Sequence, residues 1–101
     1  MNSEVAQRFW DNSPKTAKGR SLSYDGKGKL FSYGTVILQR VGNYVLGNGT
    51  SYSHTTSTHQ SIAKVYNADL ILYNVPIGRW DLLAFAYHQY EVLGRILEAT
   101  K

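Results

Sequence analysis

Two histidines and a run of hydroxyl side chains lie close together in the middle of the chain. Residues 52–60 read Tyr-Ser-His-Thr-Thr-Ser-Thr-His-Gln. An imidazole beside a hydroxyl group can activate a serine nucleophile, and histidines also ligate metals. These residue types therefore suit three kinds of site: a catalytic site, a metal centre and a site for an anion.

Catalysis and metal binding are the less favoured interpretations of these residues. His54 and His59 are five positions apart, whereas ligands on one helix face are best placed four apart, and a third ligand would have to come from His88 or Asp69. The segment has no nucleophile-elbow pattern and no carboxylate beside it. We therefore expect neither enzyme activity nor a cofactor, and a His-dependent hydrolase or nuclease is kept as an alternative.

The same segment is suited to begin a helix. Ser57 and Gln60 fit a capping box, in which the two side chains satisfy backbone amides at a helix start. His59 would then share one helix face with Ile62 and Tyr66. Because a helix start offers free amides and a positive dipole end, it suits an anion or a phosphate. The candidate contacts here are His54, Thr55, Thr56, Ser57 and His59.

A basic segment precedes this candidate anion site. From Pro14 to Arg40, six cations stand against the single acid Asp25, which gives +5 in a chain of net charge +4. Such a surface suits phosphate groups or an acidic protein, and exposed tyrosines beside it could stack on bases. The candidate contacts are Lys15, Lys18, Arg20, Lys27, Lys29 and Arg40.

Length and composition predict one globular domain over residues 1–101. The chain is 43% hydrophobic and 18% charged, which is typical of a folded domain. It contains no cysteine, so disulfides and thiolate metal sites are excluded. The first residues lack the layout of a signal peptide, and no apolar run approaches the roughly 20 residues that span a bilayer. We therefore expect a cytoplasmic protein with no membrane partner.

The elements that would position these side chains are predicted from periodicity and turn signals. A short helix capped by Ser3 is expected over residues 4–10, and a loop over 15–20. Strands are expected over residues 21–24, 29–33, 35–41, 44–46, 50–53 and 70–73. The middle helix follows Ser57, and a long helix over 80–99 carries a broad apolar stripe. The prediction is an α+β fold: an antiparallel meander of four to six short strands, with a long C-terminal helix packed on the sheet.

Two segments resemble a family of small bacteriophage-encoded proteins. Residues 30–37, Leu-Phe-Ser-Tyr-Gly-Thr-Val-Ile, are similar to a strand start of that family, Leu/Ile-Tyr/Phe-Ser-Tyr-Gly. Residues 52–60 are similar to its helix start, Tyr-Ser-x-Thr-Thr-Ser-x-His-Gln. The resemblance spans residues 30–64 and implies a phage or prophage origin without an established enzymatic activity. The positions it marks are Tyr33, Gly34, Thr55, Thr56, Ser57, His59 and Gln60.

These features together predict a small non-enzymatic phage protein in the cytoplasm of a bacterial host. Its basic surface would bind a host nucleic acid or nucleoprotein complex. Interference with host defence, as by a CRISPR inhibitor, is expected only from the small size and the resemblance. The main alternative is a module that binds a host protein or forms a homo-oligomer through its tyrosines and its long helix.

Overall fold

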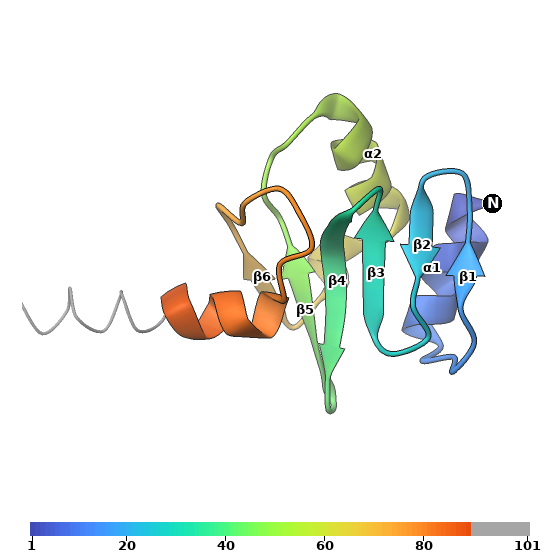
Figure 1. Cartoon of the computed structure of the whole chain (residues 1–101), viewed down its shortest axis with the longest axis horizontal. Coiled ribbons are helices and arrows are strands. Elements are labelled where there is room, and N and C mark those ends of the chain that lie inside the picture. Colours follow the sequence, from blue (N-terminus) through green and yellow to red (C-terminus); the bar gives the residue numbers. More distant parts are fainter. Residues whose placement is uncertain (90–101) are drawn as a thin grey trace, which may run out of the picture.

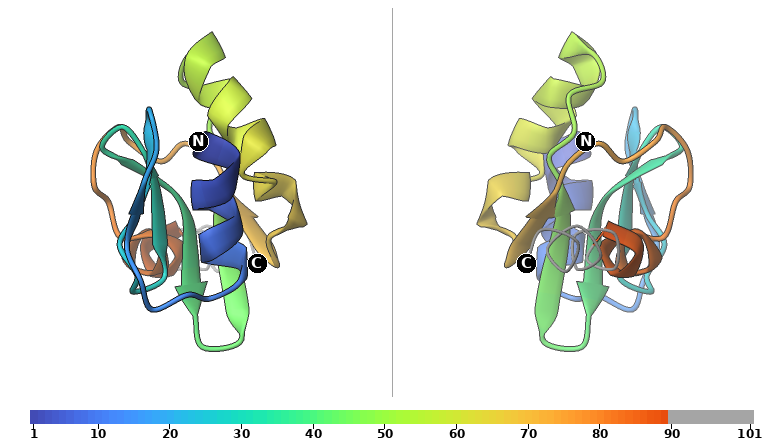
Figure 2. Two further views of the ribbon diagram at one scale, coloured as in Figure 1. Left: turned by 90° about the vertical axis from the view of Figure 1, so that its right-hand side faces the viewer. Right: turned by 90° about the vertical axis from the view of Figure 1, so that its left-hand side faces the viewer.

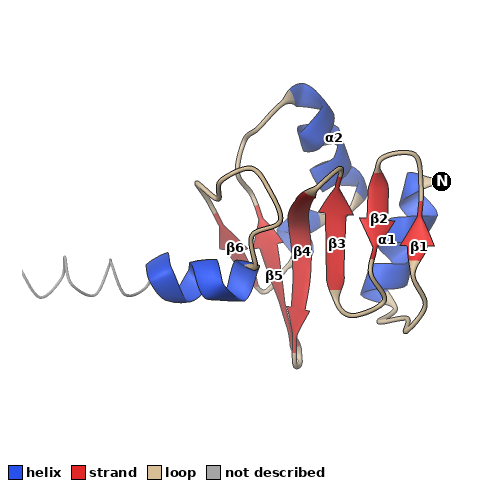
Figure 3. Cartoon of the chain, in the orientation of Figure 1, coloured by secondary structure: helices blue, strands red, loops and turns tan. Residues whose placement is uncertain are grey.

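A six-stranded sheet forms the centre of the computed structural model, which describes residues 1–89 (Figures 1 and 3). The strands lie in the order of the sequence, β1 to β6. The helices are α1 (Asn2–Trp10), α2 (His54–Ile62) and the 3₁₀ turn η1 (Val65–Asn67), and residues 82–89 are also helical. The strands are β1 (Ala17–Lys18), β2 (Leu22–Tyr24), β3 (Lys29–Ser32), β4 (Thr35–Val41), β5 (Tyr44–Asn48) and β6 (Leu70–Leu72).

The predicted α+β class is confirmed, but the sheet is mixed and not wholly antiparallel. Strands β1 to β5 are antiparallel neighbours, whereas β6 pairs with β5 in parallel, with Leu46 opposite Leu70. The long connection through α2 and η1 returns the chain to the end of the sheet from which β5 started, as parallel pairing requires. The strand predicted over 50–53 is wrong, because β5 continues through the expected turn at Gly47 and Asn48.

Helices cover both faces of the sheet (Figure 2). On one face, α1, the end of α2 and η1 enclose a core of Val5, Ala6, Phe9, Leu22, Tyr24, Leu30, Ile37, Leu38, Val45, Ala63 and Val65. On the other face, helix 82–89 packs on a core of Phe31, Val36, Leu46, Leu72, Val75, Leu82 and Ala86. A sheet buried on both faces needs continuous apolar strands, which explains why β3 and β4 do not alternate strictly.

A bulge in β4 adjusts which side chains reach each core. Leu30 is paired with Leu38 and Phe31 with Val36, so Ile37 is the extra residue. As a result Ile37 and Leu38, although adjacent in sequence, both join the core beneath α1.

The start of α2 differs from the prediction. The N-cap is Ser53, whose Oγ accepts the Thr56 amide at 3.2 Å, so the capping box at Ser57 and Gln60 is wrong. The helix begins one turn earlier because a hydroxyl at position 53 caps as well as one at 57. That register buries both His59 and Gln60 against the sheet.

Several other predicted boundaries are also corrected. Helix α2 ends at Ile62, and Lys64 has a left-handed conformation that turns the chain into η1, so Tyr66 is exposed and not on a buried helix face. The predicted loop over 15–20 contains β1. Of the helix predicted over 80–99, residues 82–89 are helical, and residues 90–99 lie outside the described part of the chain.

Candidate functional site

The imidazole of His59 is buried between two serine hydroxyls. Its Nδ1 lies 2.6 Å from Ser32 Oγ and its Nε2 lies 2.8 Å from Ser21 Oγ. Burial lowers the pKa of His59, which favours the neutral ring. A neutral imidazole donates through one nitrogen and accepts through the other, so it can bridge the two hydroxyls. His59 therefore ties α2 to the start of β2 and the end of β3.

This Ser-His-Ser group has little of the geometry of a catalytic site. Ser21 Oγ also accepts the Asn2 side-chain amide at 3.0 Å, and Ser32 is 2% exposed. Among residues 1–89, no carboxylate hydrogen-bonds His59 to orient it. Both serine hydroxyls hydrogen-bond the imidazole and so connect α2 to the start of β2 and the end of β3. The hydrogen-bonding groups that the sequence suggested for a site at His59 therefore have a structural role.

A second buried polar network fixes the segment between β5 and α2. Gln60 donates to the Asn48 and Thr50 carbonyls at 2.8 and 2.9 Å. Asn48, fully buried, donates to the Val36 carbonyl at 3.0 Å and to the Tyr52 hydroxyl at 2.9 Å. Gln60 therefore fastens α2 to the end of β5, and no capping role is left for it.

The remaining polar residues of α2 lie at its surface. His54, Thr55 and Ser57 are exposed, and Thr56 lines a cavity. Within residues 1–89, no three His, Cys, Asp or Glu side chains come close enough to hold a metal ion. The structure therefore does not bring His54 and His59 together with the third ligand that a metal centre requires.

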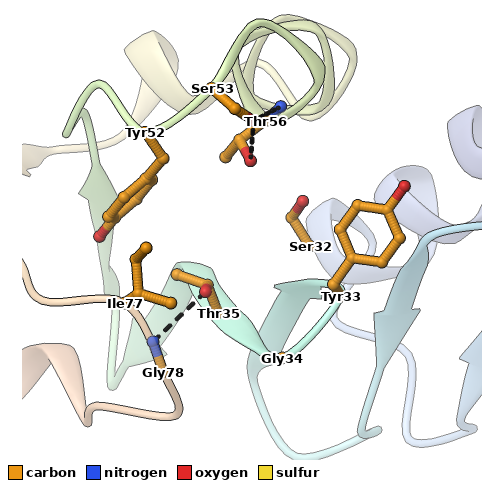
Figure 4. A pocket seen from close by; sticks show the side chains of 9 residues that line it. All are labelled: Ser32, Tyr33, Gly34, Thr35, Tyr52, Ser53, Thr56, Ile77 and Gly78. Carbon is orange, nitrogen blue, oxygen red and sulfur yellow. Dashed lines mark hydrogen bonds between the residues drawn. The ribbon is translucent and has the colours of Figure 1, made fainter.

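The cavity lies between the β3–β4 turn, the start of α2 and the loop after β6 (Figure 4). Its volume is about 320 Å³. Residues 32–35 of the turn form one wall, and the opposite walls are formed by Tyr52, Ser53, Thr56, Ile77 and Gly78. The Ser53 hydroxyl donates to Thr56 Oγ1 at 3.1 Å, and Thr35 Oγ1 accepts the Gly78 amide at 3.4 Å. The lining thus combines apolar walls with a few hydroxyl groups.

Tyr33 stands at the rim of this cavity in an unfavourable backbone conformation. It occupies the left-handed region with φ 56°, although Gly34 lies beside it in the same two-residue turn. Its side chain is 65% exposed, and its ring centroid lies 5.5 Å from that of His59. A bulky residue with positive φ costs about 1–2 kcal/mol, so the surrounding structure must hold the backbone of this turn in place.

Two of the six predicted basic contacts have structural partners. Lys29 Nζ lies 3.1 Å from Asp81 Oδ2, which links β3 to the start of helix 82–89. The Arg40 guanidinium donates to the Phe9 carbonyl at 2.9 Å and lies 5.2 Å from the centre of the Phe9 ring. Arg40 thereby holds the end of α1 against β4, and both cations are less available for an external partner.

The other four cations, which are Lys15, Lys18, Arg20 and Lys27, are exposed, and so is Arg8 in the last turn of α1. Arg8 and Lys18 line one hollow, together with Glu4. Lys27 lines a second hollow with Pro14, and the backbone at Lys15 lies against Gly26. Figure 1 shows α1, β1 and β2 at one end of the sheet. We call the exposed cations of α1 and of residues 15–27 the basic edge; its residues are Arg8, Lys15, Lys18, Arg20 and Lys27.

Positive charge is concentrated in residues 1–40, the part of the chain that forms the basic edge. Residues 1–40 contain seven lysines and arginines against three acids, and the remaining residues contain four of each. Within residues 1–89, none of the five basic-edge side chains forms an ion pair. Arg8 was not predicted as a contact, because it precedes the basic segment that begins at Pro14. Its position in the last turn of α1, just before the predicted loop over 15–20, could have indicated it.

No protein-family model, curated protein or solved structure matches the chain. The resemblance to small phage proteins and the phage origin it implies therefore stay predictions. No helix within residues 1–89 has the length and apolar character needed to cross a membrane.

Proposed function

We propose that the protein is a non-enzymatic nucleic-acid-binding protein. In this proposal the basic edge contacts the phosphate backbone of a host nucleic acid, either free or within a nucleoprotein complex. The observation that carries the proposal is that α1 and residues 15–27 expose five cations that have no ion-pair partner among residues 1–89. Unpaired cations gathered on one surface attract a polyanion and release its counterions on binding.

The positions of the two histidines in the structure support a binding role over a catalytic one. His59 is used to join three elements, and His54 is an exposed residue in the first turn of α2. The prediction of a host-defence inhibitor depends on the resemblance to phage proteins. The basic edge supports only the part of that prediction that concerns nucleic-acid binding. The hydrolase or nuclease stays an alternative prediction.

A protein-binding or oligomerising module is favoured by a different observation. The loop after β6 exposes three large side chains: Tyr73 is 52% exposed, Ile77 76% and Trp80 49%. Partner binding through this loop would be driven by apolar burial and would persist in high salt, whereas binding through the basic edge would weaken. A comparison of captured partners at low and at about 1 M salt therefore separates the two functions.

We expect Lys18→Glu to weaken nucleic-acid binding by roughly tenfold, about 1.4 kcal/mol, and to lower the salt slope by about 1. The reversed charge removes one phosphate contact and repels the neighbouring phosphate. Fluorescence anisotropy with a labelled oligonucleotide at low salt measures the change.

Lys64→Glu is the matched control, because Lys64 is an exposed lysine outside both hollows of the basic edge. It makes the same change in net charge, and we expect its affinity to stay within about twofold of the parent. Equal losses in the two variants would mean that only net charge matters, and the basic edge would not be the contact surface.

A further inference from the structure

We propose that the cavity beside Tyr33 binds one unstacked base of a single-stranded nucleic acid, with the Tyr33 ring as its stacking surface. The inference rests on the proposed function and assigns a second contact to it. The basic edge would hold the phosphates, and the cavity would hold a base.

The position of Tyr33 is the first argument. An exposed aromatic ring is maintained at the cavity rim despite its unfavourable positive φ. Backbone strain of this kind persists where the surrounding structure imposes it, and it is frequent at ligand-binding sites. The ring lies beside the buried His59 imidazole, at a centroid distance of 5.5 Å. The exposed part of the ring is free to stack against a base.

The dimensions and lining of the cavity are the second argument. Its volume of about 320 Å³ lies at the lower end of the range for small-ligand pockets, roughly 300–1,000 Å³. Tyr52 and Ile77 offer apolar surface to the faces of a planar ring. The Thr56 hydroxyl accepts from Ser53 and retains its own hydrogen to donate to a base edge. Apolar walls with few polar groups suit a heterocyclic base.

The route from the cavity to the basic edge is the third argument. The Tyr33 amide donates to the Ser21 carbonyl at 2.8 Å, so the turn that carries the ring lies against the start of β2. Arg20 is the next residue back along the chain and belongs to the basic edge. A strand whose phosphate meets Arg20 could therefore place its base beside Tyr33. A duplex keeps its bases stacked and paired, so only a single strand can use the cavity freely.

The test compares Tyr33→Asn, Tyr33→Phe and the control Tyr44→Asn for binding to a labelled 12-nucleotide oligothymidine and to a labelled duplex. Asparagine tolerates positive φ, so Tyr33→Asn removes the ring and relieves the strain. Tyr44 is an equally exposed tyrosine away from the cavity, at the start of β5. We expect Tyr33→Asn to weaken oligothymidine binding about tenfold, with an unchanged salt slope and unchanged duplex binding. Tyr33→Phe and Tyr44→Asn should bind as the parent does.

If the parent binds both probes and Tyr33→Asn loses nothing, or loses both equally, the base site is overturned while nucleic-acid binding stands. A parent that binds the duplex but not oligothymidine would also overturn the base site, because the cavity would then have no single-stranded ligand. If the parent binds neither probe at low salt, the proposed function fails and takes the base site with it. A thermal melt that keeps Tyr33→Asn at or above the parent's stability confirms that the comparison concerns binding alone.

Discussion

Replacing Phe9 by alanine should lower the free energy of unfolding by about 3–5 kcal/mol, the range for deleting a fully buried aromatic ring. Phe9 is 0% exposed and packs edge-on against both Trp10 and Tyr24, with ring centroids 5.3 and 6.2 Å away. It also supports the Arg40 guanidinium. Because Phe9 is the largest of the three buried side chains that α1 packs on the sheet, its loss leaves a cavity that the small domain cannot easily close.

Urea denaturation followed by circular dichroism measures this loss. Tyr44→Ala serves as the control, because that side chain is 68% exposed and its removal should change stability by no more than about 0.5 kcal/mol. A loss below about 1 kcal/mol for Phe9→Ala would contradict the packing of α1 described above. Such a small loss would also question the position of α1, and with it the assignment of Arg8 to the basic edge.

Replacing His59 by leucine should destabilise the protein by about 1–3 kcal/mol at pH 8, because the buried Ser32 hydroxyl would lose its partner. The double variant His59→Leu with Ser32→Ala should recover part of the loss, since it removes both members of the pair. Denaturant unfolding of the parent, the two single variants and the double variant measures the recovery. If the double variant is as unstable as the sum of the single variants, the bond between these residues is not what stabilises α2.

The same histidine predicts how stability depends on pH. Its pKa is lower in the folded protein than the ordinary value of about 6.5, so the unfolded chain binds a proton more readily. The contribution of neutral His59 to the free energy of unfolding is therefore complete above about pH 6.5. It is lost as the pH falls below that value toward the pKa of His59 in the folded protein. The slope for one proton cannot exceed about 1.4 kcal/mol per pH unit.

Asp81 changes the stability of the protein in a lower pH range than His59 does, so the two contributions can be measured separately. Burial, the largest influence, raises the pKa of Asp81, but hydrogen bonds from the Ala84 amide and from Gln39 and Lys29, with the Lys29 charge, lower it overall. Stability from a lowered carboxylate pKa is present above about pH 4 and is lost only below it. Between about pH 5.5 and 8, the parent should therefore lose stability on acidification and His59→Leu should not. Equal pH profiles would contradict a lowered pKa at His59.

The sequence was sufficient for the fold class because turn pairs and apolar runs are local signals. Asp25-Gly26 and Gly42-Asn43 predicted reversals that the structure contains, and the apolar run in β4 predicted a strand buried on both faces. The parallel pairing of β6 has no such signal, because it depends on where the chain returns after α2. The helix start was misplaced because Ser53 and Ser57 are equivalent caps in sequence, and burial of Gln60 selects between them.

The candidate site could be predicted only in part for the same reason. Lys29 and Arg40 look like the other cations of their segment, and only the folded chain places them beside Asp81 and the Phe9 carbonyl. His59 looked like a contact for an anion, but its partners Ser21 and Ser32 are 38 and 27 residues away in sequence. The left-handed Tyr33 could not be foreseen, because Gly34 beside it is the residue that a turn would ordinarily use for positive φ.

The salt dependence of binding by the parent protein tests the central claim most directly. Affinity for a labelled 12-nucleotide oligothymidine would be measured by anisotropy from about 50 to 200 mM salt. If all five cations of the basic edge contact phosphates, the plot of log affinity against log salt should fall with a slope of about −3 to −4. A slope near zero, or no binding at the lowest salt, would contradict a nucleic-acid-binding role for the basic edge.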